Sequence, residues 1–302
     1  MNRLLNGLSE EQISCVEHCP ISKYSTFRIG GTARLAVFPK SREQMIRTLQ
    51  LVGEADVSYA VVGKGSTLLF PDGEYGGVLI FTTRFDGIQC VGDGLTVLAG
   101  TSLAAVAIRA EGLSLGGAEF AAGIPGTVGG AVLMNAGAFG GCMEQIVTYV
   151  ECWNMQMKRV ERFDRGDHRF AYRTSRYAEN RGVVILEVGL ELQPRDRKTI
   201  DGLMAEYRRR RQASQPLEYP NGGSVFKNPD GYSAGKLIED CGLKGASVGG
   251  ACVSEKHANF IVNKGGATAH NVADLIGIVR QKVLEQTGIR LTCELRGLGF
   301  SL

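Results

Sequence analysis

The sequence predicts an α+β protein with two or three domains. Its 302 residues are enough for more than one packed core. A hydrophobic fraction of 44% and a charged fraction of 22% are ordinary for a soluble globular protein. Strand and helix patterns are mixed along the chain without convincing repeats. The part after a boundary near residues 200–210 has the pattern of a separate small α+β unit.

The first clear elements are a capped helix and a short buried strand. Residues 41–53 are predicted to be helical, because Ser41 and Gln44 suit a capping box and an apolar stripe follows at Met45, Leu49 and Val52. Residues 58–63 have the pattern of a buried strand that runs into a turn.

Residues 77–112 predict a strand, a hairpin and a helix in that order. The strand covers 77–83, and the hairpin covers 88–100 with Asp93-Gly94 as its turn signal. The helix covers 102–112, where Gly112 suits the C′ position.

The remaining elements follow a glycine-rich block at 116–141. We expect strands at 148–155 and 183–192, then a helix at 198–212 with Ile200, Leu203, Met204, Tyr207 and Arg211 on one face. The run Arg208–Arg211 favours a solvated helix end over a nucleic-acid patch. The final unit is expected to contain helices at 233–241 and 271–287, the second ending before Gly288, and strands at 258–262 and 290–295.

Charge and cysteine usage limit the classes of function. A net charge of +3 argues against a dedicated nucleic-acid binder. No apolar run is long enough for a membrane span, and the N-terminus lacks a secretory signal, so we expect a cytoplasmic protein. The eight cysteines are scattered and typical of reduced thiols. Cys15, His18 and Cys19 form a C-x-x-H-C pattern without a second half, so no metal is predicted.

Glycine is in excess, with 41 residues, and two glycine-rich stretches have the character of ligand cradles. In VVGKGSTLLF (61–70), a strand enters Gly63–Ser66, whose N–H groups could line a phosphate; a tight turn between strands is an equal alternative. In GGAEFAAGIPGTVGGAVLMNAGAFGG (116–141), the composition argues against any regular helix or central strand. We interpret this block as ordered loop backbone against a large flat ligand, with backbone amides and Asn135 as polar contacts.

Eight motifs in order resemble one enzyme family along essentially the whole chain. They are STFRIGG (25–31), GKGSTLL (63–69), GIPGTVGGAVLMNAGAFGG (123–141), YRTS (172–175), GGSVFKNP (222–229), AGKLIEDCGLKG (234–245), SEKHANFIVN (254–263) and CELRGLG (293–299). Their order and spacing are similar to those of the UDP-N-acetylenolpyruvoylglucosamine reductase family, the FAD enzymes of peptidoglycan precursor synthesis.

The resemblance implies a fold and a non-covalently bound FAD. It implies two FAD-binding subdomains of the vanillyl-alcohol-oxidase type, at 1–78 with the tail 296–302 and at 79–205, followed by a substrate-binding domain at 206–295. The implied cofactor-binding residues are Gly63, Lys64, Gly65, Ser66, Thr67, Gly123, Ile124, Pro125, Gly126, Thr127, Gly129, Gly130, Ala131, Asn135, Ala136 and Gly137.

The resemblance also implies the reaction and its residues. NADPH reduces FAD, flavin N5 passes a hydride to C3 of the enolpyruvyl ether, and C2 is protonated. Family positions map onto Arg173 as a clamp for the substrate carboxylate, Ser224 as the proton donor to C2, and Glu294 beside the carboxylate end. Without the resemblance, these three would be taken as a surface arginine, a turn serine and an edge-strand carboxylate. Asn228 is expected to contact the diphosphate, and Lys227 is an electrostatic candidate for substrate binding.

Three departures from the family pattern and two rival functions remain at this point. Thr67 replaces the usual asparagine after G-x-G-S, and Ser214 replaces a lysine found before Gln-Pro in many relatives. The segment Arg176–Val183 is short, which indicates the second type of the family, without the tyrosine-loop insertion. The rivals are a flavin oxidase of the same fold and a non-catalytic nucleotide-sugar binding module. The expected partners are small molecules, with no nucleic acid or membrane, and we expect a monomer.

Overall fold

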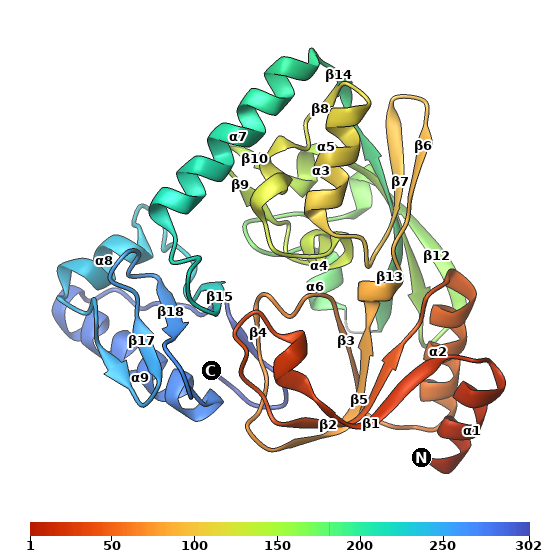
Figure 1. Cartoon of the computed structure of the whole chain (residues 1–302), viewed down its shortest axis with the longest axis horizontal. Helices are drawn as coiled ribbons and strands as arrows, with labels where there is room; N and C mark the ends of the chain where they lie inside the picture. The colour runs from red at the N-terminus through yellow and green to blue at the C-terminus, as the bar shows by residue number, and fades with distance from the viewer. Residues whose placement is uncertain (181) are drawn as a thin grey trace. The chain divides into compact units, whose positions relative to one another are not determined.

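The computed structural model describes residues 1–180 and 182–302 and divides them into two compact units (Figure 1). The first unit comprises Met1–Glu17, Leu35–Gly63 and Gly77–Arg210, and the second comprises His18–Arg34, Lys64–Gly76 and Arg211–Leu302. Both units therefore include residues from the N-terminal quarter of the chain. Arg181, in the segment Arg176–Val183 that is short compared with the family pattern, lies outside the described residues.

The N-terminal sheet contains the first predicted elements. Its strand order is β1 (Ser14–Pro20), β2 (Thr32–Phe38), β5 (Glu74–Phe81) and β3 (Tyr59–Val62), and β3 runs parallel to β5. Helix α1 (Asn2–Glu10) contacts helix α2 (Arg42–Glu54). The predicted cap of α2 is confirmed, since the Ser41 hydroxyl accepts from the Gln44 N–H at 3.2 Å. The Gln44 side chain accepts instead from Lys40 N–H, so the reciprocal half of the box is displaced by one residue.

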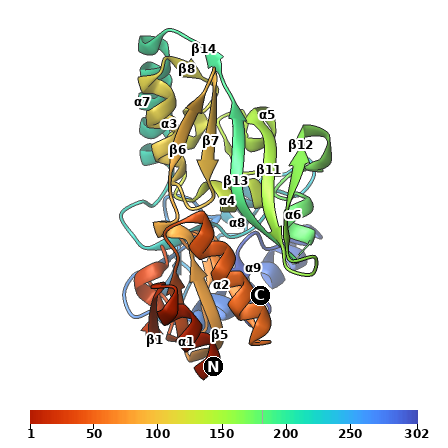
Figure 2. The ribbon, with the colours of Figure 1, turned by 90° about the vertical axis from the view of Figure 1, so that its right-hand side faces the viewer.

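A five-stranded antiparallel sheet forms the centre of the first unit (Figure 2). Its order is β12 (Arg159–Asp164), β11 (Val147–Asn154), β13 (Val183–Glu191), β7 (Gly94–Leu98) and β6 (Ile88–Val91). The central strand β13 alternates little and is buried along most of its length, because it is paired on both edges. Strands 148–155 and 183–192 and the hairpin were therefore predicted correctly from their apolar patterns.

Two turn positions predicted in this region are wrong by one or two residues. In the β6–β7 hairpin, Val91 pairs with Gly94, so the loop residues are Gly92 and Asp93 rather than Asp93-Gly94. Gly92 supplies the positive φ, 59°, that the first loop residue needs. Gly112 is the last residue of α3 (Leu103–Gly112) rather than its C′ residue, and Ser114 has the left-handed φ of 58°.

The glycine-rich block contains a short helix that its composition did not predict. Helix α4 (Val128–Leu133) includes Gly129 and Gly130. Contacts with the turn between β7 and α3 override the low helix propensity, because Val128 N–H donates to Thr101 O at 2.9 Å and Gly129 N–H donates to Ala99 O at 2.8 Å. The rest of the block is ordered, as predicted, and forms η3 (Glu119–Gly123), β9 (Gly137–Ala138) and β10 (Gly141–Cys142).

Helix α7 is longer than predicted and its arginines differ in burial. It covers Arg197–Ser214, and Ile200 and Met204 are its buried residues. Arg208, Arg209 and Arg210 are exposed, which agrees with a solvated helix end. Arg211 is not part of that solvated face, since it is half-buried and desolvation lowers the pKa of its guanidinium.

The remaining short elements of the first unit connect these layers. They are η2 (Thr82–Arg84), β8 (Leu115–Gly116), α5 (Met143–Ile146), η4 (Arg165–Asp167), α6 (Arg176–Glu179) and β14 (Gln193–Pro194). Residues from α1, α2, the two sheets, α3, α4 and α7 share one hydrophobic core in this unit.

The second unit contains a four-stranded antiparallel sheet and two helices. The strand order is β15 (Asn221–Ser224), β18 (Phe260–Asn263), β17 (Ala251–Val253) and β16 (Ser247–Val248). Helix α9 (Ala269–Thr287) contacts α8 (Ala234–Asp240) as well as β16 and β17. As predicted, α9 ends before Gly288, whose φ of 72° forms a left-handed C-cap.

The chain end of this unit departs from the prediction of a strand at 290–295. Only Cys293 forms a strand-like bridge there, with Phe226. The following strand, β19 (Arg296–Gly297), pairs in parallel with β4 (Leu68–Leu69). The element η1 (Ile21–Tyr24) also belongs to this unit, whose core includes Phe27, Leu69 and Leu295.

In the part of the chain that the structure describes, no helix is long and apolar enough to cross a membrane. Within the same residues, no cluster of three or more His, Cys, Asp or Glu side chains has the arrangement of a metal site. His18, from the C-x-x-H-C pattern, lies 2.9 Å from Glu74 through its Nδ1 atom.

The buried His168 imidazole is expected to make the protein less stable in mild acid. Its side chain is 1% exposed and its Nδ1 atom lies 2.7 Å from the Tyr177 hydroxyl. Burial lowers its pKa below the ordinary 6.5. The unfolded chain therefore binds a proton that the folded chain resists, and stability falls as the pH drops below about 6.5. Thermal unfolding at pH 7.5 and 5.5 should show a larger decrease for the wild type than for His168→Gln; equal decreases would contradict this origin.

Gly222 lies in the second unit at a position that has no room for a side chain. A methyl group on Gly222 would lie 2.6 Å from the Phe27 ring and 2.7 Å from the Leu295 side chain, both of which are buried. We expect Gly222→Ala to lower the free energy of unfolding by about 1–3 kcal/mol. The control is Gly73→Ala in the same unit, where a methyl group would have nothing within 4 Å. Denaturant unfolding of both variants checks this, and an equal effect would contradict it.

Candidate active site

The loop Gly63–Thr67 follows β3 and precedes β4. Gly65 has a φ of 61°, and a methyl group on it would lie 2.7 Å from the Tyr24 carbonyl oxygen, so this position requires glycine. Among the described residues, no acceptor bonds the N–H groups of Lys64, Gly65, Ser66 or Thr67. Successive N–H groups without protein acceptors can bind an anion such as a diphosphate.

Helix α4 in the second glycine-rich stretch is bonded tightly inside the first unit. Thr127 is its N-cap, and the Gly130 N–H points to the Thr127 hydroxyl at 3.5 Å. Together with the bonds from Val128 and Gly129 described above, this engages the first three N–H groups of the helix. A methyl group on Gly129 would lie 3.0 Å from the Ala99 Cβ. Gly129 is therefore needed for close packing, and these amides have acceptors within the protein.

Arg173 lies in a tight turn that is held from both ends. Ala171 and Thr174 exchange backbone hydrogen bonds of 3.1 and 3.2 Å, and Arg173 has a left-handed φ of 56°. Its Nη2 donates to Gly137 O at 3.4 Å, and its guanidinium lies 5.3 Å from the centre of the Tyr172 ring. The turn therefore presents a half-buried, permanently charged guanidinium next to the predicted cofactor segment.

Asn135, which was predicted as a cofactor contact, uses its carboxamide inside the first unit. Its Nδ2 donates to Ala171 O at 3.2 Å and to the Glu144 carboxylate at 3.3 Å, and its Oδ1 accepts from Glu144 N–H at 3.0 Å. The Ser175 hydroxyl donates to Leu133 O at 2.9 Å. Glu144 and Ser175 were missed by sequence reasoning, although Ser175 closes the quoted YRTS motif.

Ser224 ends strand β15 and lies opposite Phe260 of β18. The backbone just before it is irregular, because Gly223 has a φ of 75° and the pairing of β15 with β18 shifts register. A methyl group on Gly223 would lie 4.0 Å from the Ser66 carbonyl oxygen. The serine loop and the Gly63–Thr67 loop are therefore neighbours at Ser66.

Glu294 lies on the backbone segment next to Ser224. Its N–H donates to Val225 O at 2.8 Å, and Lys227 N–H donates to Thr292 O at 2.9 Å. The two segments therefore run side by side, and Ser224 and Glu294 are both half-buried. Further along, Arg296 N–H donates to Thr67 O at 3.0 Å, which ties this segment to the loop of the first glycine motif.

Asn259 holds the Ser224 segment on its other side and was also missed. It is 4% exposed, its Oδ1 accepts from Phe226 N–H at 3.0 Å and its Nδ2 donates to Phe226 O at 2.9 Å. Its position in the motif SEKHANFIVN could have indicated that Asn259 belongs to the site. Asn228 is exposed and its Oδ1 accepts from Ala234 N–H at 3.0 Å at the start of α8, while Lys227 is half-buried.

The predicted residues are thus brought together in two groups, one within each unit. In the first unit, Arg173 lies against the segment that contains Leu133, Asn135 and Gly137. In the second, the loop of Lys64–Thr67 joins the segments of Ser224 and Glu294. The free N–H run of the loop suits the diphosphate of FAD, so the donor set present fits the implied cofactor.

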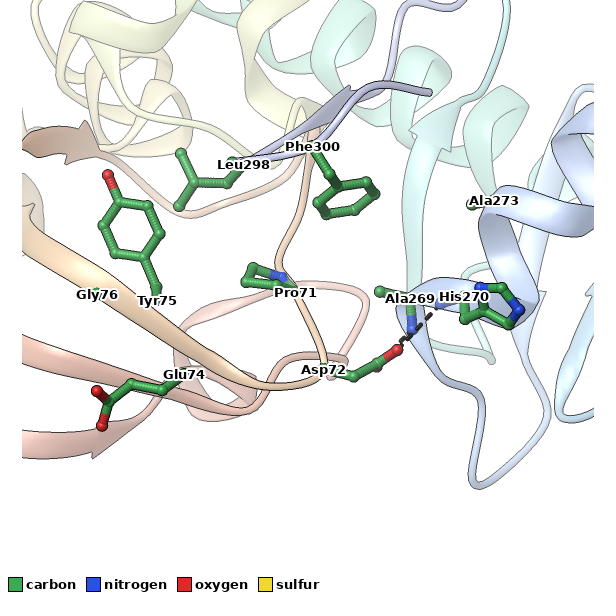
Figure 3. Close-up of a pocket in the computed structure, with 11 residues that line it drawn as sticks. Pro71, Asp72, Glu74, Tyr75, Gly76, Ala269, His270, Ala273, Leu298 and Phe300 are labelled. Carbon is green, nitrogen blue, oxygen red and sulfur yellow. Dashed lines mark hydrogen bonds between the residues drawn. The ribbon is translucent and has the colours of Figure 1, made fainter.

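A separate cavity of about 420 Å³ in the second unit contains none of the predicted site residues (Figure 3). Tyr75, Leu298 and Phe300 give it an apolar wall, and it also reaches the first turn of α9. The Asp72 carboxylate accepts there from Ala269 N–H at 2.6 Å and His270 N–H at 3.1 Å. The start of this helix is already capped by a protein anion.

Comparison with known proteins covers both parts of the chain. Residues 33–161 match the family described as "FAD binding domain", and residues 215–298 match "UDP-N-acetylenolpyruvoylglucosamine reductase, C-terminal domain". These matches, with the mixed helices and strands described above, confirm the predicted fold class of an FAD-binding part followed by a C-terminal α+β domain.

Curated relatives are similar over nearly the whole length. The UDP-N-acetylenolpyruvoylglucosamine reductase of Caldicellulosiruptor bescii is 43% identical over 97% of this chain and 93% of its own. That of Clostridium perfringens strain SM101 is 41% identical over 98% of this chain and 97% of its own. The crystal structure of the Thermus caldophilus UDP-N-acetylenolpyruvylglucosamine reductase is 34% identical, covers 94% of this chain and 98% of its own, and has a TM-score of 0.79. This chain therefore belongs to the UDP-N-acetylenolpyruvoylglucosamine reductase family.

Proposed function

We propose that this protein is an FAD-dependent oxidoreductase that uses NADPH to reduce UDP-N-acetylglucosamine enolpyruvate to UDP-N-acetylmuramate. The observation that carries the proposal is the similarity to reductases of that name over nearly the whole chain. Such a reaction supplies a peptidoglycan precursor, and through it the protein would serve cell shape and cell division.

The residues implied for the cofactor are proposed to bind FAD through backbone groups. The N–H groups of Lys64–Thr67 would bind its diphosphate, and the glycine-rich segment would pack against it through Gly123–Ala131 and Ala136–Gly137. When bound, FAD would accept a hydride from NADPH and deliver it to C3 of the enolpyruvyl group. The residues of the protein would then orient the substrate and manage the charge and proton that the reduction requires.

Arg173 is proposed to bind the substrate carboxylate. Hydride addition to C3 makes the carboxylate end of the substrate more negative, and a fixed guanidinium stabilises that developing charge without reorganising. The Arg173 turn supports this role, because reciprocal backbone bonds hold the turn and the guanidinium donates to Gly137 O. Glu294 would act at the same carboxylate end.

Ser224 is proposed to donate the proton to C2. A serine hydroxyl is a weak acid, but an enolate carbon is a strong base, so proton transfer between them is feasible when the geometry is held. The pairing of its segment with β18 and with the Glu294 segment supplies that fixed geometry. Lys227 and Asn228, on the same segment, would bind the diphosphate of the substrate.

The cellular setting is part of the proposal. NADPH and nucleotide sugars are cytoplasmic metabolites, so we propose that the protein acts in the cytoplasm. We also propose that the protein acts as a monomer.

The reaction itself is the first test. Purified protein should show flavin absorbance and should oxidise NADPH only when UDP-N-acetylglucosamine enolpyruvate is present. Flavin-loaded protein without substrate-dependent loss of NADPH would contradict the proposal. Flavin colour that remains with acid-precipitated protein would favour a covalent flavin oxidase, and colourless protein that takes up no flavin would favour a binding module.

Ser224→Ala tests the proton donor. Because Ser224 is assigned only to the substrate step, we expect flavin reduction by NADPH to change little and flavin reoxidation by substrate to slow by about two to four orders of magnitude. Stopped-flow measurement of the two half-reactions checks this. Ser247→Ala, an exposed position on β16 of the same unit, is the control and should leave both rates unchanged. Equal losses in both half-reactions of Ser224→Ala would assign the serine to binding.

A further inference from the structure

The Asn135 carboxamide is bonded entirely to protein groups of the first unit. Asn135 is 6% exposed. Both hydrogens on Nδ2 have acceptors, in Ala171 O and the Glu144 carboxylate, and Oδ1 accepts from Glu144 N–H. Its donor capacity is therefore used, and a bound cofactor could receive no hydrogen bond from it.

The orientation of this carboxamide follows from its partners. Glu144 N–H can only donate, so it must face Oδ1, and Ala171 O can only accept, so it must face Nδ2. A reversed amide would place two acceptors together at Ala171 and two donors together at Glu144. The side chain can thus bridge the two segments in one orientation only.

The bridge ends at the first carbonyl of the Arg173 turn. Ala171 O accepts from both Thr174 N–H at 3.2 Å, which closes the turn, and Asn135 Nδ2 at 3.2 Å, which ties the turn to the glycine-rich segment. The Ser175 hydroxyl ties the other end to Leu133 O. Arg173 lies between these two anchors with a left-handed φ of 56°, which costs about 1–2 kcal/mol and requires such support.

We propose that Asn135 is a positioning residue that fixes the Arg173 guanidinium for the substrate carboxylate, rather than a ligand of the cofactor. This inference rests on the proposed function, because it takes Arg173 as the carboxylate clamp. Asparagine suits position 135 for two reasons. It tolerates the left-handed φ of 43° found there, and it supplies one acceptor and two donors in a fixed plane.

The test is a double-mutant cycle between Asn135 and Arg173. Asn135→Gly removes the carboxamide while glycine keeps the left-handed backbone. We expect kcat for substrate-dependent NADPH oxidation to fall by about tenfold or more, since displacement of a clamp by about 1 Å can cost a hundredfold. The Kd of FAD and the rate of flavin reduction by NADPH should change less than about threefold. In an Arg173→Ala background, Asn135→Gly should change kcat less than about twofold, because the clamp it positions is gone.

Two control variants separate positioning from general stability. Asn154→Gly removes a carboxamide of the same unit that accepts from Gln156 N–H and Met157 N–H and donates to Glu161, without contact to the Arg173 turn. It should lower the unfolding temperature without lowering kcat. If Asn135→Gly does not fold, Asn135→Asp keeps the acceptor for Glu144 N–H but loses both donors, and it should show the same loss of kcat.

The results that would overturn the inference are specific. A fall in FAD affinity that exceeds the fall in kcat would make Asn135 a cofactor ligand. A fall in kcat of the same size with and without Arg173 would show that the two residues act independently. Failure of the proposed function would instead appear in the wild type, as absence of substrate-dependent NADPH oxidation. In that case, the rate of trypsin cleavage after Arg173, measured by mass spectrometry, tests whether Asn135 holds the turn. Cleavage should be faster in Asn135→Gly than in Asn154→Gly. Equal rates would overturn the inference.

Discussion

The pairing of the segment Ser224–Lys227 on both of its edges is the constraint on which the second unit depends. On one edge, Val225 N–H donates to Asn259 O at 2.8 Å, and on the other, Glu294 N–H donates to Val225 O at 2.8 Å. Asn259 adds a bond to each backbone group of Phe226. A segment that is hydrogen-bonded to two neighbouring segments loses its backbone freedom. The backbone positions of Ser224 and Glu294 are therefore fixed relative to each other.

In the first unit, the backbone around Arg173 is fixed by side-chain hydrogen bonds instead of strand pairing. The glycine-rich segment and the Arg173 turn are joined by three hydrogen bonds that involve side chains. Asn135 and the carbonyls of Leu133 and Gly137 supply them to Ala171, Ser175 and Arg173. Each bond alone contributes about 1 kcal/mol, and the three together hold the turn that carries Arg173.

Local sequence patterns predicted many of the helices and strands. They failed where contacts with residues distant in the sequence determine the local structure. The stripes and end signals of α2 and α9 are local, and both helices form close to the expected residues. Helix α4 was missed because the bonds that stabilise it reach Ala99 and Thr101, outside its own segment. The segment 290–295 was expected to be a strand, but only Cys293 has a strand-like partner there, in Phe226. The apolar pattern signalled burial correctly, and burial alone does not require a regular strand.

For the candidate site, the ordered motifs supplied the proposed residues, while the local sequence does not show which partners each side chain has. An asparagine in a glycine-rich cradle suggests a ligand contact, because nothing local shows that its partners are Glu144 and Ala171. The backbone gives a stronger clue once it is known. Left-handed conformations occur at Asn135, with φ 43°, and at Arg173, with φ 56°. Such conformations persist only where the surroundings hold them. A carboxamide joins the two segments directly, so the left-handed backbone at Arg173 is supported by the bond from Asn135 to Ala171 O. On the proposal above, the strain at Arg173 is the cost of holding its guanidinium in place.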